Sequence, residues 1–329
     1  YPPMPGLPEL RAAVADHYRV QGLDLAPEEV VVTSGATEAL AAAILALVSP
    51  GDEVLLFQPL YDAYWPLVER AGGTPRPIRL TPPDWRITRA ALEEAASPAT
   101  RLVILCNPLN PTGSVASEEE LATLAAFCVE RDLIAICDEV WEHVLFDGAR
   151  HRPLMTLPGM RERSVKIGSA GKIFALTGWK VGWMCAAPAL THVLLRAHQF
   201  LTFTTPPNLQ WAVAEGLRGQ IDCVEHSRAG FQRSRDRLVA GLDRLGLRTL
   251  PSRATWFVAV DLAASGVTLD DAAFCDWMVD EAGVAGLPIS AFYVEEPVTH
   301  LVRLCFAKED ATLDEALARL ERALPALPR

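Results

Sequence analysis

The sequence predicts an α/β protein with a mostly parallel central sheet, helices on both faces of that sheet, and a smaller α/β domain at the C-terminal end. Short runs of apolar and β-branched residues alternate with longer helical stretches, which is typical of strands covered on both faces. After about residue 215, a long Arg-rich helix precedes a strand–helix–strand–helix block. We therefore expect a large domain at residues 1–222 and a small domain at residues 223–329.

The elements of the large domain follow from these apolar runs. We expect strands at residues 30–33, 53–58, 74–80, 101–106, 134–138, 165–168 and 181–186. Helices fit between them at residues 37–48, 62–70, 89–96, 118–131 and 189–201. The segment 178–183 follows the preceding strand too closely for a crossover helix, so we expect an antiparallel strand there.

The small domain shows the same two kinds of pattern. Its long helix is expected at residues 224–245, followed by a strand at 255–261 and a helix at 269–281. A loop with Pro and Gly separates these from a strand at 300–306 and a helix at 313–324.

Composition and charge exclude several classes of function. Lys and Arg number 30 against 41 Asp and Glu, a net charge of −11, so we expect no nucleic-acid partner. The longest apolar run, residues 39–48, is too short to cross a bilayer, which needs about 20 residues. The seven cysteines are scattered and never form C-x-x-C, and the first residues show no secretory signal. We expect a cytoplasmic protein without a membrane partner, and the seven histidines suggest no metal site.

The segment from Ser169 to Trp183, SAGKIFALTGWKVGW, places Lys172 just after a buried strand. Lys172 is either a surface lysine on a loop or a Schiff-base lysine whose pKa is lowered by burial and by cationic neighbours. The segment alone leaves both interpretations open.

Three further segments follow predicted strands. Residues 33–37, TSGAT, join a strand to a helix, where a Gly turn and a helix N-terminus form a phosphate site. Residues 107–113, NPLNPTG, follow another strand, and 138–142, DEVWE, place Asp138 at the carboxyl end of a buried strand. Open α/β sheets bind ligands at this edge, and a buried carboxylate there needs a partner.

Taken together, these segments resemble the class I aminotransferases of fold type I, which depend on pyridoxal 5′-phosphate (PLP). Within this family, the closest likeness is to the kynurenine, glutamine and methionine transaminases. The segments, together with HLVRLCFAK at 300–308, occur in the order of the family and span nearly the whole chain.

The resemblance implies a role for each matching residue. Lys172 would carry PLP as a Schiff base and then act as the general base, and Asp138 would keep the pyridine nitrogen protonated. Asn110 would bind the ring oxygen O3′, Tyr61 would stack on the ring, and Arg303 would clamp the substrate carboxylate. The phosphate would be held by Gly35, Ala36, Thr37, Ser169, Lys180 and, from the neighbouring subunit of a homodimer, Tyr1. The resemblance also implies cis peptide bonds at Asn110–Pro111 and Gln58–Pro59.

Trp141 departs from the family pattern, which has a tyrosine at this position. The indole N–H only donates and cannot ionise, so Trp141 either reaches O3′ or fills space. The expected substrate lining is aromatic: Tyr61, Tyr64, Trp65, Trp141 and, from the neighbouring subunit, Phe200 and Phe203. Amphipathic packing accounts equally well for the last two.

This lining favours transamination between a 2-oxo acid and an apolar, sulfur-containing or aromatic amino acid such as methionine, phenylalanine, glutamine or kynurenine. A PLP-dependent cysteine-S-conjugate β-lyase of the same fold is the alternative, because it starts with the same Cα deprotonation. A PLP-binding regulator without turnover would need a DNA-binding or partner module, and the sequence shows none.

Overall fold

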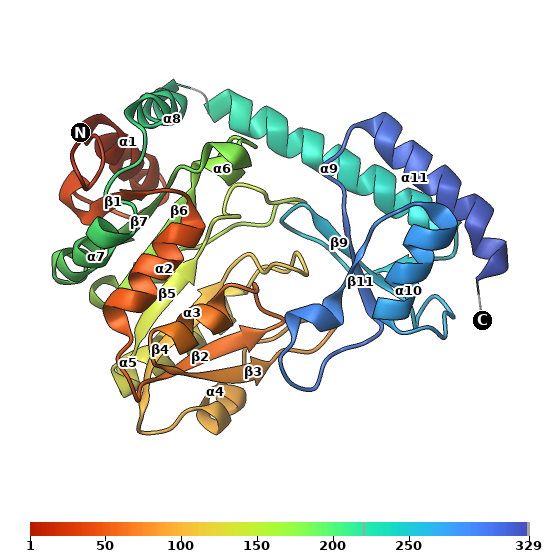
Figure 1. Cartoon of the computed structure of the whole chain (residues 1–329), viewed down its shortest axis with the longest axis horizontal. Coiled ribbons are helices and arrows are strands. Elements are labelled where there is room, and N and C mark those ends of the chain that lie inside the picture. Colours follow the sequence, from red (N-terminus) through yellow and green to blue (C-terminus); the bar gives the residue numbers. More distant parts are fainter. Residues whose placement is uncertain (220, 328–329) are drawn as a thin grey trace.

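The computed structural model describes residues 1–219 and 221–327, and it contains a seven-stranded and a four-stranded sheet (Figure 1). The strand order of the larger sheet is β1-β7-β6-β5-β4-β2-β3. Its strands are β1 (Val30–Thr33), β2 (Glu53–Gln58), β3 (Thr74–Arg79), β4 (Thr100–Cys106), β5 (Ile134–Asp138), β6 (Ser164–Ser169) and β7 (Gly182–Ala186). All seven predicted strands are therefore present, with ends shifted by one residue at most.

Strands β2 to β6 are parallel to one another, and β7 is antiparallel to both of its neighbours, β6 and β1. The predicted antiparallel strand is thus confirmed, although it begins at Gly182. Between β6 and β7 the chain forms only the short helix α6 (Ala170–Ile173) and a 3-10 turn. The carboxyl ends of β4, β5 and β6 meet at one edge of the sheet because these three strands run in the same direction.

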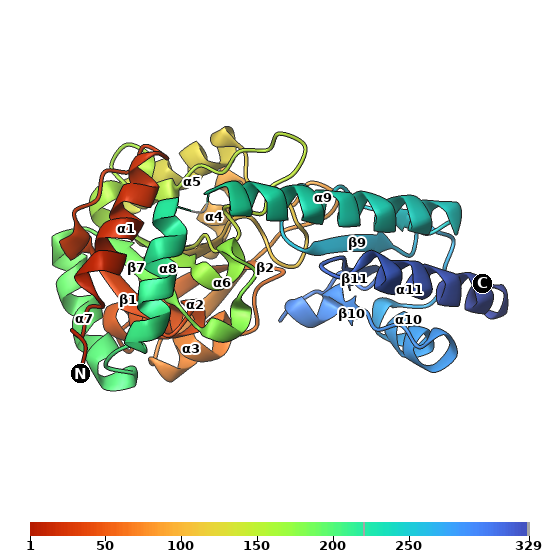
Figure 2. The same cartoon turned by 90° about the horizontal axis from the view of Figure 1, so that it is seen from above.

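Helices cover both faces of this sheet (Figure 2). Val30 and Val32 pack with α1 and α8, whereas Val31 between them packs with α2 in the larger core. This alternation follows from the two-residue period of a strand. The helices are α1 (Pro8–Arg19), α2 (Ala36–Leu47), α3 (Tyr64–Arg70), α4 (Arg89–Ala95), α5 (Glu118–Arg131), α7 (Pro188–Leu201) and α8 (Pro207–Gly219).

Helices α1 and α8 were not predicted. Each begins at a proline, Pro8 or Pro207, close to further prolines that read as turn residues. Proline is nevertheless compatible with the first turn of a helix, where the N–H has no intrahelical partner. Leu10, Val14 and Tyr18 of α1 are buried beneath α8, so tertiary packing stabilises a helix that the proline-rich start conceals.

The second sheet has the order β10-β11-β9-β8 and lies under the long helix α9 (Figure 2). The two strands and three helices predicted for this part are present, whereas the two-residue strands Arg248–Thr249 and Leu287–Pro288 were not predicted. The helix expected at 269–281 ends at Trp277 and continues as a π turn over Met278–Ala282, and the helix expected at 313–324 begins at Asp310. The elements are α9 (Ile221–Arg244), β8 (Arg248–Thr249), β9 (Phe257–Asp261), α10 (Asp271–Trp277), β10 (Leu287–Pro288), β11 (Leu301–Cys305) and α11 (Asp310–Ala323). The predicted domain boundary between residues 222 and 223 falls at the start of α9 and stays a prediction. The last two residues of the predicted small domain, 328–329, lie outside the described residues.

Both predicted cis bonds, Gln58–Pro59 and Asn110–Pro111, are present, as are cis bonds at Pro82–Pro83 and Asn107–Pro108. Among the described residues, no helix is long and apolar enough to cross a membrane.

Candidate active site

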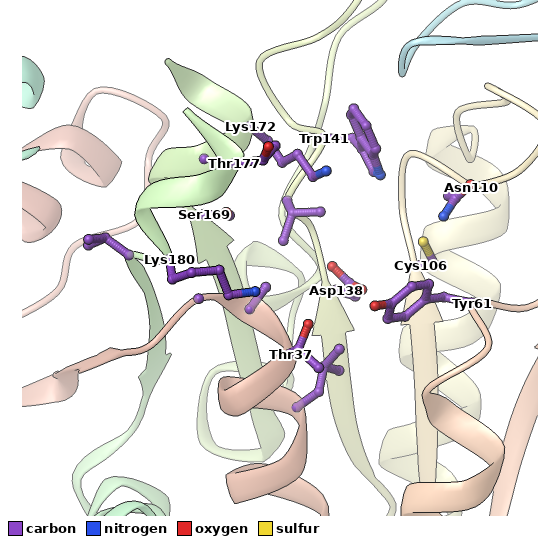
Figure 3. Close-up of a pocket in the computed structure, with 16 residues that line it drawn as sticks. Thr37, Tyr61, Cys106, Asn110, Asp138, Trp141, Ser169, Lys172, Thr177 and Lys180 are labelled. Atoms are coloured by element: carbon purple, nitrogen blue, oxygen red, sulfur yellow. The ribbon is translucent and has the colours of Figure 1, made fainter. Parts of the chain in front are cut away.

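A pocket of about 210 Å³ lies where the carboxyl ends of β4, β5 and β6 meet the N-terminus of α2 (Figure 3). Three strand ends supply Cys106, Asp138 and Ser169 to its wall. The other lining residues are Gly35, Ala36, Thr37, Leu40, Tyr61, Asn110, Val140, Trp141, Gly171, Lys172, Thr177, Lys180 and Val181. The topology of the sheet therefore gathers residues that are more than 130 positions apart in the chain.

Lys172 extends into this pocket from α6 (Figure 3). Its Nζ lies 4.5 Å from the ring centroid of Trp141 and 4.9 Å from that of Trp256. Burial lowers the pKa of Lys172, and the positive charges of Lys180 and Arg303 act in the same direction against the opposing charge of Asp138. A larger share of Lys172 is therefore the neutral, nucleophilic amine at neutral pH than for an ordinary lysine.

Asp138 is buried at the end of β5, and its two carboxylate oxygens differ in their partners. The Tyr64 hydroxyl donates to Oδ2 at 2.6 Å, whereas Oδ1 is buried without a hydrogen-bond partner. Burial raises the pKa of Asp138, while the hydrogen bond from Tyr64 and the charge of Lys172 oppose that shift. A buried oxygen without a partner is costly, so Oδ1 calls for a donor in the pocket.

The N-terminus of α2 forms an anion cradle with Lys180. Gly35 precedes the helix with φ of +82°, and a Cβ built there would lie 3.3 Å from Cε and 3.4 Å from Nζ of Lys180. A side chain at position 35 would thus crowd the ammonium group. Ala36 and Thr37 present the first N–H groups of the helix, so positive charge and helix dipole favour a phosphate here.

Arg303 reaches the pocket from β11 of the second sheet. Its Nη1 donates to Asn110 Oδ1 at 2.8 Å, and its guanidinium lies 4.0 Å from the ring centroid of Phe257 and 4.8 Å from that of Phe292. The two rings hold the guanidinium plane in place while part of its donor fork remains available for a carboxylate.

Trp141 lies beside Lys172, and its indole nitrogen is directed into the pocket (Figure 3). It packs edge-on against Trp256, with centroids 5.0 Å apart, and against Phe257 at 5.7 Å. The side chain is 3% exposed. This position leaves both interpretations of Trp141, donor and space-filling ring, open.

Ten of the residues predicted for the cofactor line this one pocket: Gly35, Ala36, Thr37, Tyr61, Asn110, Asp138, Trp141, Ser169, Lys172 and Lys180. Arg303 joins them through Asn110. Tyr1 does not reach the pocket of its own chain; it is exposed and contacts Phe203 edge-on at 5.9 Å. Its contribution to a neighbouring subunit stays a prediction.

Two residues expected in the substrate lining lie elsewhere. Tyr64, the first residue of α3, is buried and donates to Asp138, and it is not among the residues that line the pocket. Trp65 packs against the hydrophobic core. Conversely, Trp256, Phe257 and Phe292 around Lys172 and Arg303 were not predicted, since nothing in their local sequence marks a site that two sheets form together.

Comparison with known proteins agrees with this geometry. Residues 1–320 match the family model for aminotransferases of class I and II. The chain is 43% identical over 333 residues to a probable N-succinyldiaminopimelate aminotransferase of Mycobacterium tuberculosis (97% of this chain and 84% of that protein). It is 40% identical over 325 residues to the methionine aminotransferase of Escherichia coli (98% and 84%). The structure of the N-succinyldiaminopimelate aminotransferase from Mycobacterium tuberculosis superposes with a TM-score of 0.95 at 44% identity, covering 98% of this chain and 85% of that one.

The fold and the pocket define a PLP-dependent enzyme of fold type I, with a lysine, a buried aspartate and an anion cradle around one cavity. The chain belongs to the class I and II aminotransferases. PLP is the cofactor of this class, and the pocket fits it: the buried Asp138 Oδ1 needs a donor, and the cradle at Gly35 suits a phosphate.

Proposed function

We propose that this aminotransferase exchanges the amino group of an apolar, sulfur-containing or aromatic L-amino acid, of the methionine, phenylalanine, glutamine or kynurenine type, with a 2-oxo acid. The aromatic surroundings of Lys172 and Arg303 carry this proposal. None of the described residues that line the pocket is an arginine, and Arg303, which donates to Asn110 beside it, is assigned to the α-carboxylate. Trp141, Trp256, Phe257 and Phe292 instead provide apolar surface.

Lys172 would hold the cofactor and move the proton of the reaction. When bound, PLP accepts the electron pair released at the substrate Cα. The lowered pKa of Lys172 leaves a neutral amine that would take the Cα proton and return it two bonds away, at C4′. Trp141 and Trp256 exclude water from this amine because their rings flank it.

Asp138 and Tyr64 would orient the ring. Tyr64 fixes Oδ2, so Oδ1 is directed at a single partner, and we assign this partner as the protonated pyridine nitrogen. Asn110 would bind O3′ and Tyr61 would stack on the ring face. Gly35, Ala36, Thr37, Ser169 and Lys180 would hold the phosphate.

Arg303 would bind the α-carboxylate of the substrate. Its hydrogen bond to Asn110 links the carboxylate site to the cofactor site, and Phe257 and Phe292 restrict the guanidinium to one plane. Two parallel N–H···O bonds then fix the direction of the substrate Cα.

We also propose a homodimer. Several large apolar side chains are exposed on the described surface, among them Tyr1, Phe200, Phe203, Trp179 and Trp211. Lys180 lines the pocket, and its neighbour in the chain, Trp179, is exposed. An interface that covers these exposed side chains would therefore lie close to the site. Light scattering should give twice the 35.8 kDa of one chain, and a monomer at micromolar concentration would contradict the proposal.

An amino-acid panel tests the substrate assignment. The PLP-loaded protein is mixed with methionine, phenylalanine, glutamine, kynurenine, aspartate or N-succinyl-L,L-diaminopimelate, and the change from the PLP to the pyridoxamine phosphate absorbance band is followed. We expect the first four to react faster than aspartate. Faster reaction with N-succinyl-L,L-diaminopimelate, the substrate in the name of one relative, would move the assignment to a dicarboxylate.

The β-lyase alternative has less support, because the relatives named above are aminotransferases. Pyruvate and ammonia released from a cysteine S-conjugate, faster than 2-oxo-acid-dependent turnover, would favour it.

A further inference from the structure

A buried ion cluster lies on the opposite side of the segment that carries Asp138 and Trp141. Lys166 is completely buried on β6, and its Nζ donates to Glu139 Oε2 and to Glu142 Oε2, each at 2.7 Å. His151 Nε2 lies 3.3 Å from Glu139 Oε2. The Tyr18 hydroxyl donates to Glu142 Oε1 at 2.7 Å, and the Tyr18 ring lies 4.5 Å from the Lys166 Nζ. We call these five residues the Lys166 cluster.

The spacing of the cluster follows the spacing of the pocket residues. Asp138 and Trp141 line the pocket, whereas Glu139 and Glu142, each one position further along, contact Lys166. Each pocket residue of this segment therefore has a neighbour in the chain whose carboxylate is paired with the Lys166 ammonium group.

Lys166 lies on the strand that leads to the other wall of the pocket. It lies on β6, three positions before Ser169 and six before Lys172, and both of these line the pocket. The two ion pairs therefore connect the chain that leaves β5 with the strand that leads to Lys172. The register of β5 with β6 ends at Asp138 and Ile167, and one further backbone bond runs from the Glu139 N–H to the Ile167 carbonyl at 3.2 Å. Beyond it β6 pairs with β7 as far as Ser169, so the chain from Val140 to Glu142 has no ladder bond to β6 and the ion pairs supply the link.

Within the cluster, Lys166 and the two glutamates form an ion pair network, while both ring nitrogens of His151 are buried without a hydrogen-bond partner. Ligand atoms of Glu139, Glu142 and His151 lie within 4.8 Å of one another, a set that could hold a metal ion. The Lys166 ammonium already contacts both carboxylates and supplies the positive charge there. The remaining oxygen of Glu139 accepts from the Leu154 N–H at 3.0 Å, so both carboxylates are fully engaged.

We propose that Lys166 is a positioning residue of the active site: its two ion pairs set the separation between the Asp138–Trp141 wall and the Lys172 wall. This inference rests on the proposed function, because it concerns the fit of the pocket to PLP. Positions that bind a cofactor must be held to about half an ångström, so loss of the link should weaken PLP binding even where the fold survives.

Two variants separate positioning from stability. Lys166→Met leaves two buried carboxylates without their cation, and we expect the melting temperature of the apoprotein to fall by roughly 10 °C. The triple variant Lys166→Met, Glu139→Gln, Glu142→Gln removes all three charges together and should recover most of that temperature, because a neutral replacement of a buried ion network is often tolerated.

The decisive readout is the dissociation constant of PLP, measured by quenching of tryptophan fluorescence in the apoprotein. We expect about tenfold weaker binding in both variants, so that the triple variant regains stability but not affinity. An affinity within twofold of the wild type in either folded variant would overturn the proposal. An affinity that recovers together with the melting temperature would equally show that the cluster only stabilises the fold.

Arg235→Met is the matched control. Arg235 is 7% exposed, contacts Asp147 and Asp236, and does not line the pocket. It should lower the melting temperature while leaving the PLP affinity within twofold of the wild type; a tenfold loss in this variant would mean that instability alone accounts for weak binding. A wild-type protein that binds no PLP would instead contradict the proposed function, before any variant is compared.

Discussion

Lys166 and Lys172 lie six residues apart on the same strand–helix connection, yet their surroundings are opposite. Lys166 contacts two carboxylates, whose charges outweigh its burial and hold its pKa above the ordinary value. Lys172 lies against two indole rings and forms no ion pair with any residue that the structure describes, and burial lowers its pKa. The same side chain is therefore a fixed cation in one place and a reactive amine in the other.

Burial alone therefore does not make a lysine reactive. Desolvation acts on both groups in the same direction, and the number of neighbouring carboxylates decides the outcome. Asp138 is the acidic group that faces Lys172, and Tyr64 already engages one of its two oxygens.

The largest effect is expected from Lys172→Ala, which removes the reactive amine. Transamination should fall by more than about 100-fold, because general base catalysis alone typically contributes 10²–10⁴. The protein should remain folded and retain PLP non-covalently through its other contacts, as circular dichroism and equilibrium dialysis can show. A variant with more than about a hundredth of the wild-type kcat would exclude Lys172 as the base.

Asp138→Asn removes the negative charge nearest to the proposed position of the ring nitrogen. We expect kcat to fall by about 100-fold, the typical cost of losing one preorganised electrostatic partner. The pKa of Lys172 should fall further, since the charge of Asp138 makes the largest contribution that raises it. Single-turnover kinetics over a pH series would check both; an unchanged rate would place the ring nitrogen elsewhere.

Tyr64→Phe leaves Asp138 in place but removes the donor to Oδ2. Losing a hydrogen bond to a charged acceptor costs about 1.5–3 kcal/mol, so PLP affinity should weaken by about tenfold or more. Tyr293→Phe is the matched control, because the hydroxyl of Tyr293 donates to the Leu80 carbonyl outside the pocket. Equal PLP affinities of the two variants would argue against an orienting role for Tyr64.

The smallest effect is expected from Lys172→Met in the apoprotein. The folded-state pKa of Lys172 lies below its ordinary value, so the unfolded chain binds more protons between these two values, and stability rises with pH across that window. The substitution should remove this dependence and raise the melting temperature at neutral pH by about 2–4 °C. A lower melting temperature would mean that the Lys172 ammonium is stabilised in the fold, as that of Lys166 is.

The sequence predicts the residues that line the pocket better than the residues that hold them in position. Lys172, Asp138, Asn110 and the 33–37 turn follow buried strands, and parallel strands bring such residues to one edge, so local patterns suffice to place them. Tyr64 and Lys166 carry no comparable signal. Lys166 lies within an apolar strand pattern, and only the paired sheet shows that Glu139 and Glu142 meet it.

The same reasoning explains the remaining differences in the fold. Helix α5 matches its predicted bounds because Ser117 and Glu120 form a capping box and Asp132 ends the helix in the left-handed region. Helix α1 has no side-chain cap and starts beside three prolines, so its existence depends on burial against α8. A local cap thus marks the ends of α5 in the sequence, whereas no local signal of this kind marks α1.

Borohydride trapping would identify the lysine that carries PLP. The PLP-loaded protein is reduced with sodium borohydride, which fixes PLP covalently to the lysine that carries it, and is then digested and analysed by mass spectrometry. We expect that the peptide with Lys172 carries the label and that the peptides with Lys166 and Lys180 do not. Label on Lys166 or Lys180, or an unlabelled Lys172 in a protein that has bound PLP, would contradict it.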